Sequence, residues 1–116
     1  MHYLLVLTLS AAPALADPAV VEDISATRSD EGWRFSVTLA HGDTGWDDYA
    51  DGWRVETPDG EVLGRRELVH PHVDEQPFTR SLSGVAIPAE LDEVHIRAST
   101  SVEGWAETTV TFPLPR

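Results

Sequence analysis

The sequence of 116 residues contains no cysteine. It therefore has no disulfide bond, no thiolate metal site and no cysteine to carry a lipid anchor. A chain of this size without disulfides must take its stability from an apolar core. Lysine is also absent, so the eight basic residues are all arginine, against 20 acidic residues. The formal net charge of −12 disfavours nucleic acid and anionic membrane surfaces as partners and favours cationic ones.

The sequence also lacks an apolar run long enough to cross a bilayer, which takes roughly 20 residues. A short apolar run at 4–9 is followed by small residues at Ala14 and Ala16, and this pattern is typical of a secretory signal peptide. We predict a signal peptide over 1–16, although no basic residue precedes the run, and a single domain over 17–116. The expected location is periplasmic or secreted, with no stable membrane anchor.

No segment shows a helical hydrophobic period, whereas a period of two is common. In the clearest example Trp33, Phe35, Val37 and Leu39 alternate with polar residues, which predicts a strand with one buried face. Gly64 interrupts another extended run and predicts a β-bulge. The strands predicted in this way cover residues 20–27, 33–40, 53–57, 61–69, 78–83, 94–99 and 110–114.

Seven short strands separated by turn signals favour an all-β, antiparallel two-sheet sandwich. Trp53 lies where immunoglobulin-like sandwiches often bury a tryptophan, and the layout resembles the immunoglobulin and fibronectin type III class. The segments 41–51 (HGDTGWDDYAD) and 70–80 (HPHVDEQPFTR) resemble a group of small secreted bacterial proteins of unassigned function. This resemblance implies the fold and export, and no particular chemistry.

The residues able to do chemistry are concentrated in alternate loops. Successive antiparallel strands run in opposite directions, so the second, fourth and sixth loops should meet at one end of the sandwich. These loops cover residues 41–49, 70–77 and 101–106. The first two of them contain His41, Asp43, Asp47, Asp48, His70, His72 and Glu75. We therefore predict that the working surface of the protein is this end.

A metal site is one interpretation of this end. His70 and His72 are two residues apart, which on an extended chain places both imidazoles on one side, and Pro71 restricts the backbone between them. With His41 or Glu75 they would form a ligand set that suits zinc or copper(II). Exposed loop histidines, or a histidine bonded to a loop carbonyl, explain the same pattern. The aspartates of the first loop lack the spacing of a helix-loop-helix calcium site.

Partner binding is the other interpretation. Trp46, Tyr49 and Trp105 are expected at or near the same end, where aromatic side chains serve as contact anchors or fold back over the core. Asp47 and its neighbours would attract a cationic protein or small ligand. No nucleophile motif or phosphate-binding loop occurs, so catalysis is not expected. The sequence thus predicts an exported, non-catalytic binding or accessory module, with a zinc or copper(II) protein as the alternative.

Overall fold

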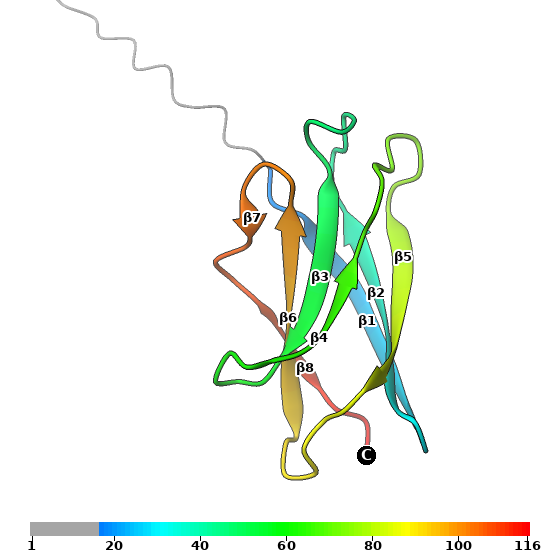
Figure 1. Cartoon of the computed structure of the whole chain (residues 1–116), viewed down its shortest axis with the longest axis vertical. Helices are drawn as coiled ribbons and strands as arrows, with labels where there is room; N and C mark the ends of the chain where they lie inside the picture. The colour runs from blue at the N-terminus through cyan, green and yellow to red at the C-terminus, as the bar shows by residue number, and fades with distance from the viewer. Residues whose placement is uncertain (1–16) are drawn as a thin grey trace, which may run out of the picture.

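The computed structural model describes residues 17–116, which form eight strands (Figure 1). The predicted signal peptide over 1–16 lies outside the described residues. Within residues 17–116 no helix is long and apolar enough to cross a membrane. The strands are β1 (Val20–Ser29), β2 (Gly32–Ala40), β3 (Ala50–Glu56), β4 (Val62–Glu67), β5 (Phe78–Val85), β6 (Glu93–Thr100), β7 (Gly104–Trp105) and β8 (Val110–Pro113).

The strands form two antiparallel sheets, which confirms the predicted all-β sandwich. One sheet has the order β1-β2-β5. The other has the order β4-β3-β6, and both β7 and β8 pair with β6 at successive positions along its remaining edge. Every pairing is between antiparallel strands. Because direction reverses at each strand, loops that follow even-numbered strands up to β6 lie at one end of the molecule (Figure 1).

The core lies between the sheets and takes side chains from both. Trp33, Phe35, Val37 and Leu39 on β2 are all at least 97% buried, as the alternating pattern predicted. Trp53 on β3 has no exposed surface. A domain without disulfides depends on an apolar core of this kind.

The β-bulge predicted at Gly64 is present. The register between β3 and β4 shifts where Val55 pairs with Gly64 and Glu56 pairs with Val62. A Cβ atom at Gly64 would lie 3.0 Å from a methyl group of Leu82 on the opposite sheet. Glycine at this position therefore lets the two sheets approach closely.

The C-terminal part of the chain differs from the expected single strand. The predicted strand over 110–114 corresponds to β8, but Gly104 and Trp105 form an additional strand, β7. Ser99 pairs with Trp105 and Ile96 pairs with Val110, so β6 holds both segments. Trp105, expected in a loop, is therefore fixed on a sheet edge by backbone pairing.

Candidate functional site

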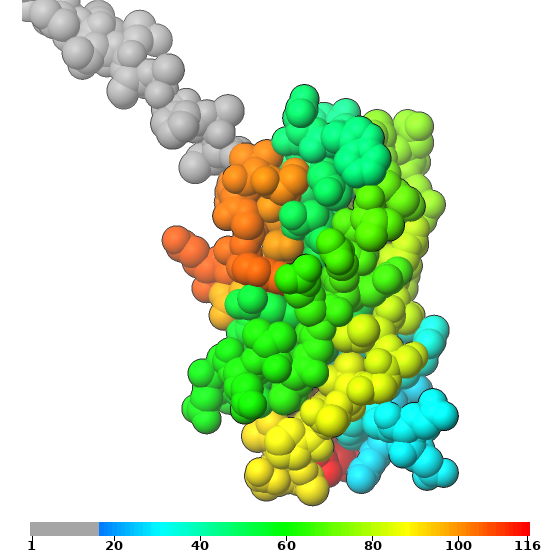
Figure 2. Space-filling view, in the orientation of Figure 1, coloured from blue at the N-terminus to red at the C-terminus, as the bar shows by residue number. Residues whose placement is uncertain are grey.

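Three loops lie together at one end of the sandwich, as the alternation of strand direction predicted. They join β2 to β3 (41–49), β4 to β5 (68–77) and β6 to β7 (101–103), and we call them the tip. Figure 1 shows all three at the same end, and in the space-filling view they form the upper end of the molecule (Figure 2). The tip is the first candidate surface.

The Asp43 carboxylate ties two of these loops together. Its side chain has no exposed surface. Oδ1 accepts hydrogen bonds from His41 Nδ1 at 2.6 Å and from the backbone N–H of Ala50 at 3.0 Å. Oδ2 accepts from the backbone N–H of His72 at 2.8 Å, 29 residues further along the chain. Because the acceptor is charged and buried, these bonds are strong and hold the loops in one arrangement.

His41, predicted as a metal ligand, is held inside the protein by hydrogen bonds from its ring and its backbone. The ring is buried, and its Nδ1 donates to Asp43 while its Nε2 lies 2.9 Å from the carbonyl oxygen of Asp17. Both ring nitrogens therefore face acceptor oxygens inside the protein. The backbone N–H of His41 donates to Gln76 Oε1, which makes a second link between the loops.

His72 packs between other side chains of the second loop and β5. Its ring stacks on Phe78 with centroids 4.0 Å apart, and Arg80 Nη2 lies 2.7 Å from its Nε2. Arginine is only a donor, so Nε2 accepts and Nδ1 carries the hydrogen, without a partner among residues 17–116. Burial, the positive charge of Arg80 and the neighbouring His70 lower the pKa of His72 below its usual value of 6.5.

The remaining predicted metal ligands lie at the surface of the second loop. The exposed His70 ring lies beside that of His72, with centroids 4.7 Å apart. Glu75 is exposed and pairs with Arg80 at 3.6 Å. In the described part of the chain no group of three or more histidine or acidic side chains is arranged to hold a metal ion. The structure thus does not bring His41, His70, His72 and Glu75 together as a site for zinc or copper(II).

The predicted partner-binding residues of the first loop lie at the surface. Trp46 is 67% exposed and packs edge-on against Tyr49, with centroids 5.7 Å apart. Asp47 is exposed and Tyr49 is half-buried. The backbone N–H of Tyr49 donates to Ser101 Oγ at 3.0 Å, so the third loop supports the first. Trp46 therefore projects from a supported loop and does not cover the core.

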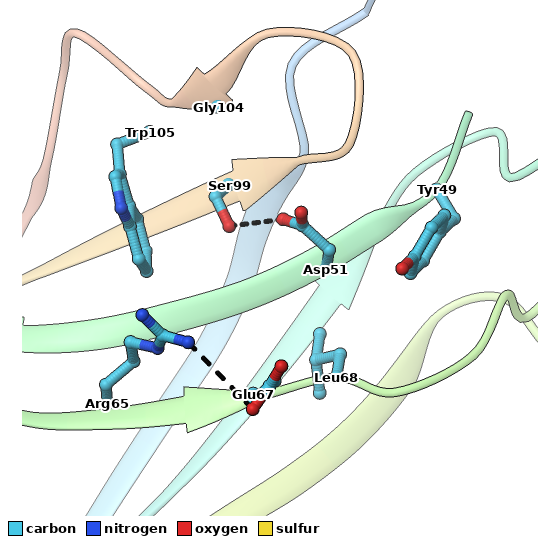
Figure 3. A pocket seen from close by; sticks show the side chains of 8 residues that line it. All are labelled: Tyr49, Asp51, Arg65, Glu67, Leu68, Ser99, Gly104 and Trp105. Carbon is cyan, nitrogen blue, oxygen red and sulfur yellow. Dashed lines mark hydrogen bonds and ion pairs between the residues drawn. The ribbon is translucent and has the colours of Figure 1, made fainter. Parts of the chain in front are cut away.

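A groove of about 190 Å³ lies beside the tip, on the outer face of the β4-β3-β6 sheet (Figure 3). We call it the outer groove. Tyr49 and Trp105 stand on opposite sides of it in Figure 3, and the Ser99 hydroxyl donates to Asp51 Oδ1 between them. The side chains that shape the groove are Tyr49, Asp51, Arg65, Glu67, Ser99 and Trp105.

An ion-pair cluster fixes the Trp105 wall of the groove. The Arg54 guanidinium lies 4.1 Å from the Trp105 ring centroid and donates from Nε to Glu56 Oε2 at 2.6 Å. Arg97 binds both oxygens of the buried Glu56 carboxylate and also donates to the Ala106 carbonyl, next to Trp105. Hydrogen bonding from Arg97 lowers the pKa of Glu56, against the opposing effect of burial, and raises the pKa of Arg97.

Sequence reasoning missed Asp43 as a structural residue and the outer groove as a site. The signal for Asp43 was its position two residues after His41 in a loop, which does not show whether the carboxylate faces inward. The groove depends on the pairing of β3 with β6, which places Gly52 opposite Ser99, a residue remote in sequence. Local spacing carries no information about that pairing.

Comparison with known proteins gives one partial relationship. A protein of Halomicrobium mukohataei named "Putative lipoprotein" is 48% identical to this chain over 71 residues, which is 61% of this chain and 34% of that protein. The chain thus spans about a third of the length of the relative that it matches. No family model matches the chain, and no solved structure matches it.

Proposed function

We propose that this protein is an exported, non-catalytic accessory module that docks through the tip onto a basic surface of a partner protein. The proposal keeps the predicted surface and gives up the metal alternative, because the rings of His41 and His72 are engaged in hydrogen bonds within the tip and with β5. The chemical character of the partner is inferred from the apolar and charged side chains that the three loops expose.

The main support for this proposal is that every loop of the tip exposes a large apolar side chain. Trp46 is 67% exposed in the first loop, Val69 and Val73 are 67% and 53% exposed in the second, and Val102 is 52% exposed in the third. Scattered apolar residues are normal on a protein surface, but a group at one end indicates an interaction site. Trp46 is the natural anchor, because tryptophan dominates the binding energy of many interfaces.

The charges of the tip select the partner. Its exposed acidic residues are Asp47, Asp74, Glu75 and Glu103, and the three loops contain no arginine or lysine. A rim of carboxylates around apolar anchors attracts a basic surface and repels an acidic one. The net charge of −12 adds a long-range field of the same sign.

The hydrogen bonds of Asp43 also support docking. They fix the relative positions of the first and second loops, so little loop entropy would be lost when a partner binds.

The name of the Halomicrobium mukohataei relative supports a location in the cell envelope, which agrees with the export predicted for this chain. The β1-β2-β5 sheet opposite a sheet that begins β4-β3-β6 supports the resemblance to immunoglobulin and fibronectin type III domains.

Site-specific photo-crosslinking in cells that produce the protein tests this proposal. A photoreactive amino acid replaces Trp46 in one variant and Val62 in the control variant. Val62 is 48% exposed and lies near the β3–β4 turn at the opposite end. We expect a discrete adduct from position 46, with a partner whose contact surface is basic, and none from position 62. Equal adducts at both positions, or none at position 46, would refute docking through the tip.

A further inference from the structure

The outer groove combines two features that the tip does not have, namely a recess and a fixed set of polar groups facing aromatic rings. Tyr49 and Trp105 stand on opposite sides of it, and Asp51, Ser99, Arg65 and Glu67 supply acceptors and donors between them (Figure 3). We propose that this groove binds one ring of a neutral, polyhydroxylated ligand, that is, a saccharide unit.

The backbone at Gly52 keeps the groove open. A Cβ atom there would lie 3.1 Å from Ser99 Oγ and 3.6 Å from Cη2 of Trp105. The first distance is tighter than an ordinary van der Waals contact, as is the 3.2 Å to the backbone carbonyl oxygen of Arg66, so a methyl group would push the Ser99 hydroxyl and the β4 backbone away by a few tenths of an ångström. Glycine at this position therefore leaves the Ser99 hydroxyl undisturbed at the floor of the groove.

The aromatic walls are held in place before any ligand arrives. Trp105 is fixed by its pairing with Ser99 and by the Arg54 guanidinium against its ring, which in turn is held by Glu56. Tyr49 is supported by the Trp46 ring. Fixed aromatic rings offer flat apolar surfaces at low entropic cost, and the C–H face of a sugar ring is a matching surface.

The polar groups match hydroxyls. The Asp51 carboxylate takes the Ser99 hydroxyl on Oδ1 and has Oδ2 as a further acceptor. Arg65 and Glu67 are 3.9 Å apart, and their side chains are 58% and 69% exposed. An exposed pair at that distance is weak, so both groups remain able to bond a ligand. A hydroxyl donates and accepts, so a ring with several hydroxyls can use the carboxylates and the guanidinium together.

The charges of the groove argue against an ionic ligand. Asp51 and Glu67 would repel an anion in the groove, and Arg65 would repel a cation. A cation stacked on Trp105 would also share that ring with Arg54. The volume of about 190 Å³ is below the roughly 300 Å³ at which pockets for drug-sized ligands begin, and it suits a single ring.

Nuclear magnetic resonance titration of the full domain tests the inference. The probes are glucose, galactose, mannose and N-acetylglucosamine with their short oligomers, and choline and acetate are the charged comparators. We expect at least one saccharide to shift the Trp105 indole N–H and the Asp51 amide saturably, in the millimolar range. Neither choline nor acetate should do so. No saturable shift with any saccharide, or a stronger one with choline, would overturn the proposal.

Three variants separate this site from the tip. Trp105→Ala and Gly52→Ala should weaken saccharide binding at least about tenfold, which is about 1.4 kcal/mol. Val73→Ala, at an exposed residue of the tip that does not line the groove, should weaken it less than about threefold. Chemical-shift spectra and thermal unfolding confirm that each variant is folded. Saccharide binding that survives Trp105→Ala would place the ligand elsewhere and refute the groove.

Discussion

Replacing Asp43 by alanine should be the most damaging single change at the tip. The substitution removes the acceptor of three buried donors, namely His41 Nδ1 and the backbone N–H groups of Ala50 and His72. A buried donor left without a partner costs about 1–3 kcal/mol, and more where a charge is involved. Allowing for partial relaxation and water entry, we expect Asp43→Ala to lower the free energy of unfolding by about 4 kcal/mol.

The substitution Asp43→Asn gives a graded comparison. The asparagine side chain keeps one oxygen, and placing it at the Oδ1 position preserves the bonds from His41 and Ala50. The amide NH₂ would then face the N–H of His72, donor against donor. Asp43→Asn should therefore cost about 2 kcal/mol. Asp47→Ala, at an exposed acid of the same loop, is the matched control and should stay within about 0.5 kcal/mol of the parent.

Urea and thermal unfolding followed by tryptophan fluorescence measure these differences. For a domain of this size each kcal/mol shifts the midpoint by about 4–8 °C, so Asp43→Ala should melt roughly 15–30 °C below the parent. Hydrogen exchange of the Ala50 and His72 amides should become faster in the same variant. If Asp43→Ala unfolds within about 1 kcal/mol of Asp47→Ala, the carboxylate is not holding the loops and the reasoning fails.

Three further predictions concern charge. Because the pKa of His72 is lowered in the folded protein, the unfolded chain binds the proton more readily, so the free energy of unfolding should fall as pH drops below 6.5; His72→Gln should flatten this slope in denaturant titrations. The pKa of Glu56 is also lowered, so its stabilisation is present above pH 4.5 and is lost on further acidification. Glu56→Gln should cost about 2 kcal/mol in urea unfolding, because Arg97 and Arg54 are partly solvated and tolerate the loss better than fully buried charges would. Finally, added sodium chloride should raise the thermal midpoint by screening the net charge of −12, and a midpoint independent of salt would contradict this.

The sequence predicted most of the fold because its signals are local. Trp33, Phe35, Val37 and Leu39 mark a strand by their period of two, and Gly64 marks a bulge where that period fails. The common end of the loops followed from the reversal of direction at each strand. The role of His41 could not be predicted, because it depends on an aspartate that also binds the backbone of a residue remote in sequence.

Trp105 shows the same limit for the candidate sites. Its surroundings in sequence suggest a loop, whereas backbone pairing with Ser99 places Trp105 beside the outer groove, across from Tyr49. Whether a loop aromatic anchors a partner or forms the wall of a groove depends on such pairing. Trp46, without a long-range backbone constraint of this kind, is exposed on the first loop, which is one of the two arrangements that the sequence left open.

The central claim is that apolar anchors surrounded by carboxylates make the tip a docking surface for a basic partner. The most direct test is the affinity of the purified protein for the partner identified by crosslinking, measured by calorimetry over a range of salt concentrations. The account predicts that binding weakens as salt increases, that Asp47→Asn reduces this dependence, and that Trp46→Ala weakens binding at least about thirtyfold, or about 2 kcal/mol. Affinity that is indifferent both to salt and to Trp46 would contradict it.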